Sequence, residues 1–393
     1  MTKLFLFCGA LAAGEYLASF APNLSETWPV AACVGALVAL FGYGCAVRGW
    51  RVAVVFFLGI ALYQLAATSG ERAIREQPWL RGRERYQRRS AAEECETRAH
   101  VKRDFSRRVV IGLEEEREAV PLLRAILLGE RTRLPRRTKQ LFVTSGTMHV
   151  FAISGLHVMA IAEVLSFALC LLFVPRRFGG LLATPLLWGY VWLIGFSPSA
   201  VRAAVMATIL FLAPVGWRKP NGLRAWALTF LGVHAVNPLL IDDVGNALSF
   251  AVMLAIVLAG ECGRNLTKVG QSLLVTVAAW AVGVPIAAHV FGRVTPGGML
   301  ANLVLIGAAK LAVVAGAMGL FASYVSETFA AHLNNFGALA IRGMVLVAEG
   351  VTWIPGANFE TGKWSLPACV GWYAALAAVA YLILRLRASR KTL

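Results

Sequence analysis

The chain has 393 residues, of which 58% are hydrophobic and only 15% are charged, and it carries a formal net charge of +17. A soluble globular domain is nearer half apolar and a quarter charged, so this composition excludes an ordinary soluble protein. It indicates instead a protein that crosses a membrane several times.

Residues 1–69 contain three apolar runs, which we expect to form N-terminal transmembrane helices of roughly 17–25 residues each. The first run contains Glu15 and follows a single basic residue, Lys3. We therefore predict that this run is retained as a helix and is not cleaved as a signal peptide. The three runs are Leu4–Ala21, Val30–Val47 and Val52–Thr68.

Residues 70–140 form a charged segment that we expect to be soluble and, because it follows the third span, extracytoplasmic. Positions 71–139 hold 19 of the 38 Lys and Arg residues and 12 of the 21 Asp and Glu residues. Alternating Arg and Glu at helical spacing is typical of a solvated helix with ion pairs one turn apart. It is equally compatible with a basic surface that binds DNA. That surface would consist of Arg81, Arg83, Arg85, Arg88, Arg89, Arg107 and Arg108.

Two local patterns lie near the end of this segment. Val109–Leu113 is compatible with one short strand. The stretch from Pro121 to Gly129 has the spacing of an amphipathic helix, which Gly129 is well suited to end.

Nine further apolar runs lie in residues 141–393, which we expect to form the membrane core. Phe336–Val351 is short and charged, and Met299–Val325 is long and rich in glycine, so a re-entrant or interfacial placement of either is left open. We predict an all-α, polytopic transmembrane bundle of about ten to twelve spans. The runs are Val150–Val174, Gly180–Phe196, Ala200–Gly216, Leu223–Leu240, Val244–Gly260, Ser272–Phe291, Met299–Val325, Phe336–Val351 and Leu366–Leu384.

Lys and Arg gather in every second loop of this core, for example in Pro175–Arg177 and Trp217–Arg224, and again in Arg385–Lys391. Cytoplasmic loops of membrane proteins carry such an excess. We therefore predict that the N-terminus and the C-terminus are both cytoplasmic.

The head of the run that begins at Val150 is unusually polar, because His149, Ser154, Gly155 and His157 lie close together there. Polar groups at membrane depth are costly, so this cluster is a functional-site hypothesis. Ser154 and His157 are spaced as a hydrolytic pair could be, but no carboxylate is placed to orient the histidine and Gly-x-Ser-x-Gly is absent from the sequence. The sequence also lacks a P-loop and zinc-binding histidine patterns, so we expect no catalytic residues, no metal and no cofactor.

Four motifs follow one another over about residues 120–320, of which the first is the specific one. They are Leu127–Arg131 followed by Gly146–Val158; Arg202-Ala-Ala-Val-Met206; Pro238 followed by Asp243-Val-Gly-Asn-Ala-Leu-Ser-Phe250; and Pro285 followed by Asn302. In this order and spacing they resemble the signature of the ComEC family of competence DNA-uptake channels. Asn246 and Ala247 depart from that signature, which has Phe-Gln at these two positions.

The resemblance implies a channel in the bacterial inner membrane that passes single-stranded transforming DNA into the cytoplasm. In such a channel Ser154 and Gly155 can bend a helix, and Arg202 can contact a phosphate as the strand enters. His149 and His157 are donors that need no permanent charge. The residues that we expect along this path are His149, Ser154, Gly155, His157, Arg202, Asp243, Ser249 and Asn302.

Simpler roles for the same residues are left open. A membrane histidine can bond a carbonyl of a neighbouring helix, and Arg202 can extend to the lipid headgroups. Asp243 can cap the helix that begins at Val244, and Ser249 can bond the backbone of its own helix.

The resemblance also implies partners beside DNA and membrane lipids. No energy-coupling motif is present, so the drive must come from a cytoplasmic ATP-driven motor or from the proton gradient. We also expect an extracytoplasmic DNA receptor and a separate nuclease, and a homo-oligomer is left open. Full-length relatives usually carry an oligonucleotide-binding β-domain and often a metallo-β-lactamase-like domain. Neither is visible in this sequence, so we expect the membrane core alone.

Two alternative functions are left open. One is a secondary transporter or exporter of a smaller anionic substrate, which the same polar core would suit. The other is a ComEC paralogue that does not conduct. A continuous polar path wide enough for a nucleotide chain would favour DNA over a smaller anion.

Overall fold

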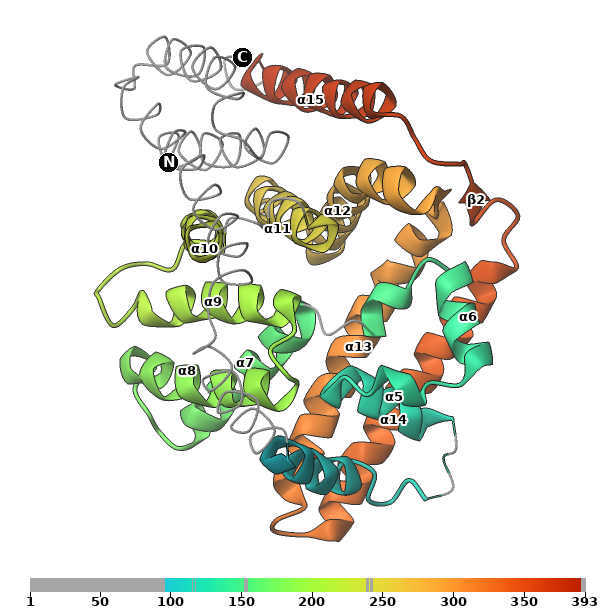
Figure 1. Cartoon of the computed structure of the whole chain (residues 1–393). Coiled ribbons are helices and arrows are strands. Elements are labelled where there is room, and N and C mark those ends of the chain that lie inside the picture. The colour runs from blue at the N-terminus through green and yellow to red at the C-terminus, as the bar shows by residue number, and fades with distance from the viewer. Residues whose placement is uncertain are drawn as a thin grey trace, which may run out of the picture. The chain divides into compact units, whose positions relative to one another are not determined.

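The computed structural model describes residues 96–114, 116, 118–151, 155–237, 240 and 243–389 (Figure 1). Nearly all of the regular structure in these residues is helical, which confirms the predicted all-α class. The exceptions are two short strands, β1 (Arg293–Val294) and β2 (Phe359–Glu360), which pair antiparallel with Arg293 opposite Glu360. The three predicted N-terminal spans lie outside the described residues.

Three of the described helices are long and apolar enough to cross a membrane: α11 (Val244–Cys262), α12 (Lys268–Phe291) and α13 (Pro296–Ala322). Each coincides with an apolar run predicted from the sequence. Shorter apolar helices include α7 (Gly155–Leu171) and α9 (Pro198–Leu212). The total of about ten to twelve spans stays a prediction.

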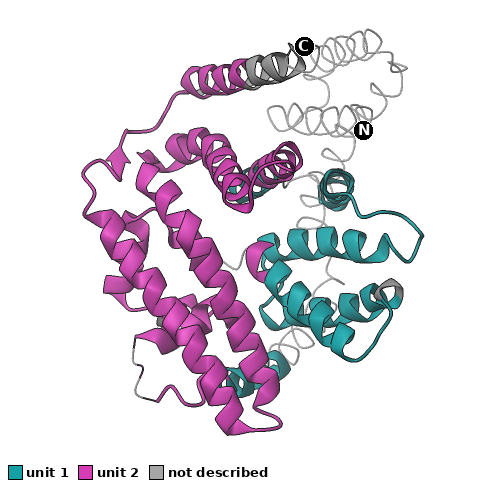
Figure 2. Ribbon diagram, turned by 180° about the vertical axis from the view of Figure 1, so that it is seen from behind, with its two compact units in different colours: residues 1–108, 158–250 teal, residues 109–157, 251–393 magenta. Residues whose placement is uncertain are grey.

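The chain divides into two compact units, coloured separately in Figure 2. The described part of unit 1 comprises residues 96–108 and 158–250, and that of unit 2 comprises residues 109–157 and 251–389. Helix α7 has its first residues in unit 2 and the rest in unit 1, and α11 begins in unit 1 and ends in unit 2.

Unit 1 is built around α9, which packs against α8 (Arg176–Leu193) and α10 (Gly222–Val236). Helices α8 and α9 lie alongside each other and run in opposite directions (Figure 1). A Cβ at Gly180, near the start of α8, would overlap the carbonyl oxygen of Phe211, near the end of α9. Further along, Nε1 of Trp188 donates to Oγ1 of Thr208 over 3.1 Å. The start of α8 and the end of α9 therefore lie at the same end of this helical hairpin.

Unit 2 is built around α13 and α14 (Glu327–Thr352), which pack along each other and against α5 (Ala119–Leu128). Leu123 of α5 and Ile341 and Met344 of α14 are almost completely buried. Small residues let these helices approach closely, since a Cβ at Gly316 would lie 2.8 Å from Cδ1 of Leu127. The apolar runs over residues 299–325 and 336–351 thus belong to two continuous helices.

Helix α5 confirms the amphipathic helix predicted to end at Gly129. Gly129 is left-handed, with φ 71°, and its N–H donates to the carbonyl of Ala125 over 3.1 Å. Although α5 belongs to the segment expected to be soluble, most of its residues are buried and it packs against α13 and α14. The domain boundary near residue 140 stays a prediction.

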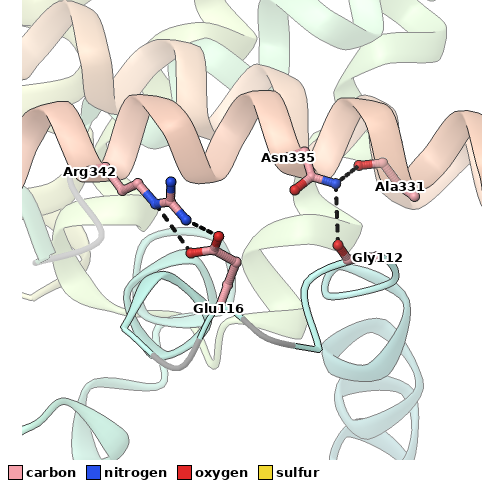
Figure 3. A network of polar contacts seen from close by, with 5 residues as sticks. All are labelled: Gly112, Glu116, Ala331, Asn335 and Arg342. Atoms are coloured by element: carbon pink, nitrogen blue, oxygen red, sulfur yellow. Dashed lines mark hydrogen bonds and ion pairs between the residues drawn. The ribbon is translucent and has the colours of Figure 1, made fainter.

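The segment before α5 is attached to α14 by the polar contacts in Figure 3. Nδ2 of Asn335 donates to the carbonyl of Gly112 over 3.2 Å and to that of Ala331 over 2.9 Å. About two helical turns further along α14, Arg342 forms an ion pair with Glu116. The strand considered for Val109–Leu113 is wrong: these residues form a turn, in which Gly112 has φ 78°.

A proline in α12 explains how α15 (Leu366–Ser389) packs against it. Pro285 has no N–H, so the carbonyl of Ala281 loses its partner within the helix. Nε1 of Trp372 in α15 donates to this carbonyl over 2.9 Å. The proline thereby creates the acceptor that α15 uses.

Candidate functional site

Arg202 is the centre of a buried polar network in unit 1. It lies on the second turn of α9, which opens with Pro198 at a position where proline is favoured, and it is only 4% exposed. Nε donates to Oγ of Ser249 over 3.1 Å and Nη1 donates to Oδ1 of Asn246 over 3.2 Å. Nη2 donates to the carbonyl of Gly245 over 3.4 Å. Two motifs that are separate in the sequence therefore meet at one guanidinium.

All three of these acceptors are electrically neutral. In the part of the chain that the structure describes, no carboxylate lies within ion-pairing distance of Arg202. Asp243 acts on the guanidinium only through the longer-range Coulomb interaction, and the ring of Phe250 lies 5.8 Å from Cζ. Arginine has five N–H donors, so two have no partner among the residues that the structure describes. A buried positive charge with donors to spare can bind an anion.

Asn246 accepts a hydrogen bond from the guanidinium and is itself bonded to His234. Both residues are fully or almost fully buried. Nδ1 of His234 lies 2.9 Å from the carbonyl of Phe230, and since a carbonyl only accepts, Nδ1 carries the proton. Nε2 of the neutral ring then accepts from Nδ2 of Asn246 over 3.1 Å. Nδ2 also donates to the carbonyl of Leu240 over 2.9 Å, so Oδ1 must face Arg202.

Asp243 and Ser249 reach the network in different ways. Oδ1 of Asp243 accepts from the backbone N–H of Asn246 over 2.5 Å, which is the helix-capping contact considered from the sequence. Ser249 instead uses its hydroxyl as an acceptor for Arg202. Both side chains thus fix the first turns of α11 beside the arginine.

The first motif forms a tight turn in unit 2, between α6 (Arg136–Thr144) and the short helix η2 (Met148–Phe151). Gly146 has φ 74°, and a Cβ there would lie 2.5 Å from Oγ1 of Thr295, just before α13. Oγ of Ser145 and Oγ1 of Thr147 are 2.6 Å apart, and both residues are buried. The turn is therefore packed against the start of α13 with no room for a side chain at Gly146.

His149 projects from η2 and is exposed, and its imidazole interacts with the side chain of Asn302 in α13 and with the backbone of Gly146. The structure thus brings His149 and Asn302 together, as it does Arg202 and Ser249. His157 is completely buried near the start of α7, where Gly155 is the first residue and is half-buried. Ser154 lies outside the described residues.

Comparison of the sequence with models of known protein families shows which family the chain belongs to. A family model described as Competence protein matches residues 126–386, which is well over half of the chain.

The chain belongs to the competence protein family.

Curated relatives match the chain over part of its length. ComE operon protein 3 of Bacillus subtilis (strain 168) is 28% identical over 176 residues, which cover 44% of this chain and 23% of the relative. Competence protein ComA of Neisseria gonorrhoeae is 31% identical over 182 residues, which cover 42% of this chain and 25% of the relative. An uncharacterized protein of Aquifex aeolicus (strain VF5) is 30% identical over 185 residues, which cover 46% of this chain and 43% of the relative. The chain thus covers less than half of each relative, and no solved structure matches it.

The competence family match contains both polar clusters, that around Arg202 and that around His149. Family membership together with the long apolar helices makes this a membrane protein. The match leaves out the basic residues considered as a DNA surface. Among these, Arg107 is exposed and Arg108 pairs with Asp104 over 2.9 Å, one turn away. The other members of that set, Arg81, Arg83, Arg85, Arg88 and Arg89, lie outside the described residues.

Sequence reasoning missed His234 and Asn246. Asn246 stood out only as a departure from the ComEC signature, and His234 belonged to no motif. A signal was nevertheless present, since both are polar residues inside or beside apolar runs and lie 12 positions apart on consecutive helices.

Proposed function

We propose that this competence protein forms the membrane passage through which single-stranded transforming DNA enters the cytoplasm. The observation that carries the proposal is the buried guanidinium of Arg202, which is held by neutral groups and has two N–H donors without a partner in the described part of the chain. Family membership supports the substrate class, because the matching family model and the relative from Neisseria gonorrhoeae are both named as competence proteins.

Each nucleotide carries one phosphate charge into a medium where an uncompensated ion is strongly disfavoured. A fixed guanidinium can neutralise one phosphate at a time. The acceptors that orient Arg202 are neutral, so its charge stays available to the strand. A phosphate that meets a single such group is stabilised without being trapped, and the strand can move on.

The proposal assigns no chemical step to this chain. Binding and conduction are its tasks, while a cytoplasmic ATP-driven motor or the proton gradient pulls the strand. A separate nuclease would supply the single strand and an extracytoplasmic receptor would deliver the duplex. We place the protein in the bacterial inner membrane as a multi-pass protein with both termini in the cytoplasm. The passage is formed by one copy of the chain or by a homo-oligomer.

Arg202 would serve a smaller anion as well as DNA, so the transporter alternative predicts the same binding group with a different substrate. Uptake of labelled duplex DNA distinguishes the two. In a competent strain from which the gene is deleted, we expect label to stay bound outside the cell with no labelled strand in the cytoplasm, and the wild-type gene to restore entry. If deletion leaves DNA entry unchanged, the DNA-passage proposal is wrong, and the small-anion transporter or the non-conducting paralogue takes its place.

A further inference from the structure

Helix α14 lies at the same depth in the membrane as α13, the longest of the three described helices that can cross it. A short turn over residues 323–326 joins the two helices, which run antiparallel. A Cβ at Gly337 would lie 3.6 Å from the carbonyl oxygen of Ala312, so these two positions are level. The same pairing, continued along both helices, places Arg342 close to the middle of α13. Arg342 therefore lies near the centre of the membrane that α13 crosses.

The exposed sides of these two helices differ in polarity. Around the middle of α13 the exposed side chains are apolar, and Lys310 is half-buried. These exposed side chains are Leu303, Val304, Ile306 and Leu311. On α14, polar and apolar side chains are exposed together: His332, Asn335, Phe336, Leu339, Arg342 and Leu346. With 26 residues α14 is long enough to cross a membrane, but it is not among the described helices that are apolar enough to do so.

An ion pair occupies the exposed side of α14. Nε of Arg342 donates to Oε2 of Glu116 over 3.2 Å and Nη2 donates to Oε1, so the pair is bidentate (Figure 3). The side chain of Arg342 is 59% exposed. A charged group at this depth is costly against lipid, and such residues face the protein interior or a water-filled cavity. Because Arg342 is not buried in the protein, a water-filled cavity is the surrounding that fits it.

The backbone beside the ion pair gives an independent reason. Residues 109–112 form a turn, and the carbonyl of Gly112 accepts from Nδ2 of Asn335 on this side of α14. Glu116 belongs to no helix or strand. Lipid cannot satisfy the N–H and C=O groups of irregular backbone, which occurs at membrane depth only inside protein or along a water-filled cavity. Gly112 and Glu116 are only half-buried, so the cavity is again the surrounding that fits.

We propose that this side of α14, together with Gly112 and Glu116, forms part of the wall of a water-filled path across the membrane. Arg342 is the group of this wall that offers positive charge to an anion in the path, and Glu116 holds it in place. The proposal rests on the proposed function in assuming a passage, but it does not require that the substrate is DNA. Its test measures contact with water, so its failure and the failure of DNA entry are distinguishable.

The reactivity of single cysteines distinguishes water from lipid. They replace Leu339 or Leu346 on α14 and, as controls within two turns of the middle of α13, Leu303 or Ile306. The seven native cysteines of the full chain are first changed to alanine. The purified protein is placed in phospholipid vesicles with a charged methanethiosulfonate reagent on both sides. We expect the α14 cysteines to react at least about tenfold faster than the α13 cysteines, because the reactive thiolate forms only where water reaches it.

Two results of this measurement would overturn the proposal. Equally slow reaction of all four cysteines would show that lipid, a second copy or another segment covers this side of α14. Equally fast reaction of all four would show that the α13–α14 hairpin does not lie in the membrane.

Removal of charge provides a second readout that needs no cysteine. Glu116→Gln leaves Arg342 without its carboxylate, whereas the double variant Glu116→Gln/Arg342→Gln has no charge at the pair. Water solvates a lone guanidinium, so we expect the two variants to have the same Tm in vesicles. A clearly lower Tm for Glu116→Gln than for the double variant would place Arg342 against lipid and overturn the proposal.

Discussion

Asn246 donates from its amide nitrogen to Nε2 of His234 over 3.1 Å, and this bond determines that the amide oxygen faces Arg202. The direction of the amide depends on a neutral histidine whose other nitrogen donates to the carbonyl of Phe230. His234 thus determines, through Asn246, how the side chain of Arg202 is held.

The first prediction concerns His234→Phe, which keeps a ring in place but removes the acceptor for Asn246. Because Asn246 is buried, its donor is left partly unsatisfied, and we expect the free energy of unfolding to fall by about 1–3 kcal/mol. Thermal unfolding in detergent measures the change. His332→Phe is the control, since His332 makes the same type of bond, from Nδ1 to Thr328, but is exposed. Equal losses in the two variants would show that the contact with Asn246 contributes nothing.

The second prediction concerns Gly146→Ala in the turn before η2. The added Cβ meets Thr295 at 2.5 Å and the residue must keep φ 74°, so we expect a loss of about 1–3 kcal/mol in stability and less folded protein in the membrane. Gly189→Ala in α8 is the control, because no atom lies within 4 Å of its added Cβ. That substitution should be neutral or stabilising by up to about 1 kcal/mol. A stable, monodisperse Gly146→Ala variant would contradict the tight packing described here.

The third prediction tests the role of Pro285 in binding α15. Trp372→Phe removes the donor to the carbonyl of Ala281, and we expect it to cost about 1–2 kcal/mol in the wild-type background. In Pro285→Ala the backbone N–H returns and can satisfy the same carbonyl, so the further cost of Trp372→Phe should be smaller. A double-mutant cycle on thermal unfolding measures the difference. Strictly additive effects would mean that the proline and the tryptophan do not share that carbonyl.

Much of the fold followed from local patterns. The apolar runs located α11, α12 and α13, and the glycine at position 129 correctly ended α5. Local patterns failed where tertiary contacts decide. Val109–Leu113 has the composition of a strand, yet Asn335 of α14 binds the carbonyl of Gly112 and a turn forms instead.

The site was predictable only in part, for a physical reason. Motif reading selected Arg202 and Ser249 separately, but nothing in a linear sequence shows that residues 47 positions apart will share a hydrogen bond. Asn246 was set aside as a departure from the family signature, whereas the fold makes it the link between two helices. A polar residue that departs from a family signature inside an apolar run can therefore indicate a buried hydrogen bond to another helix, as Asn246 does here.

Cytoplasmic entry of labelled DNA in the deletion strain tests the proposal that Arg202 receives the phosphates of an entering strand. The strain is complemented at matched membrane levels with the wild type, Arg202→Gln, Arg202→Lys or Arg224→Gln. Arg224 is an exposed arginine on α10 and serves as the control. Loss of a charge-assisted contact should reduce entry by about tenfold to a hundredfold in Arg202→Gln and less in Arg202→Lys, while Arg224→Gln stays at the wild-type level. Entry at the wild-type level in Arg202→Gln would show that Arg202 does not receive the phosphates.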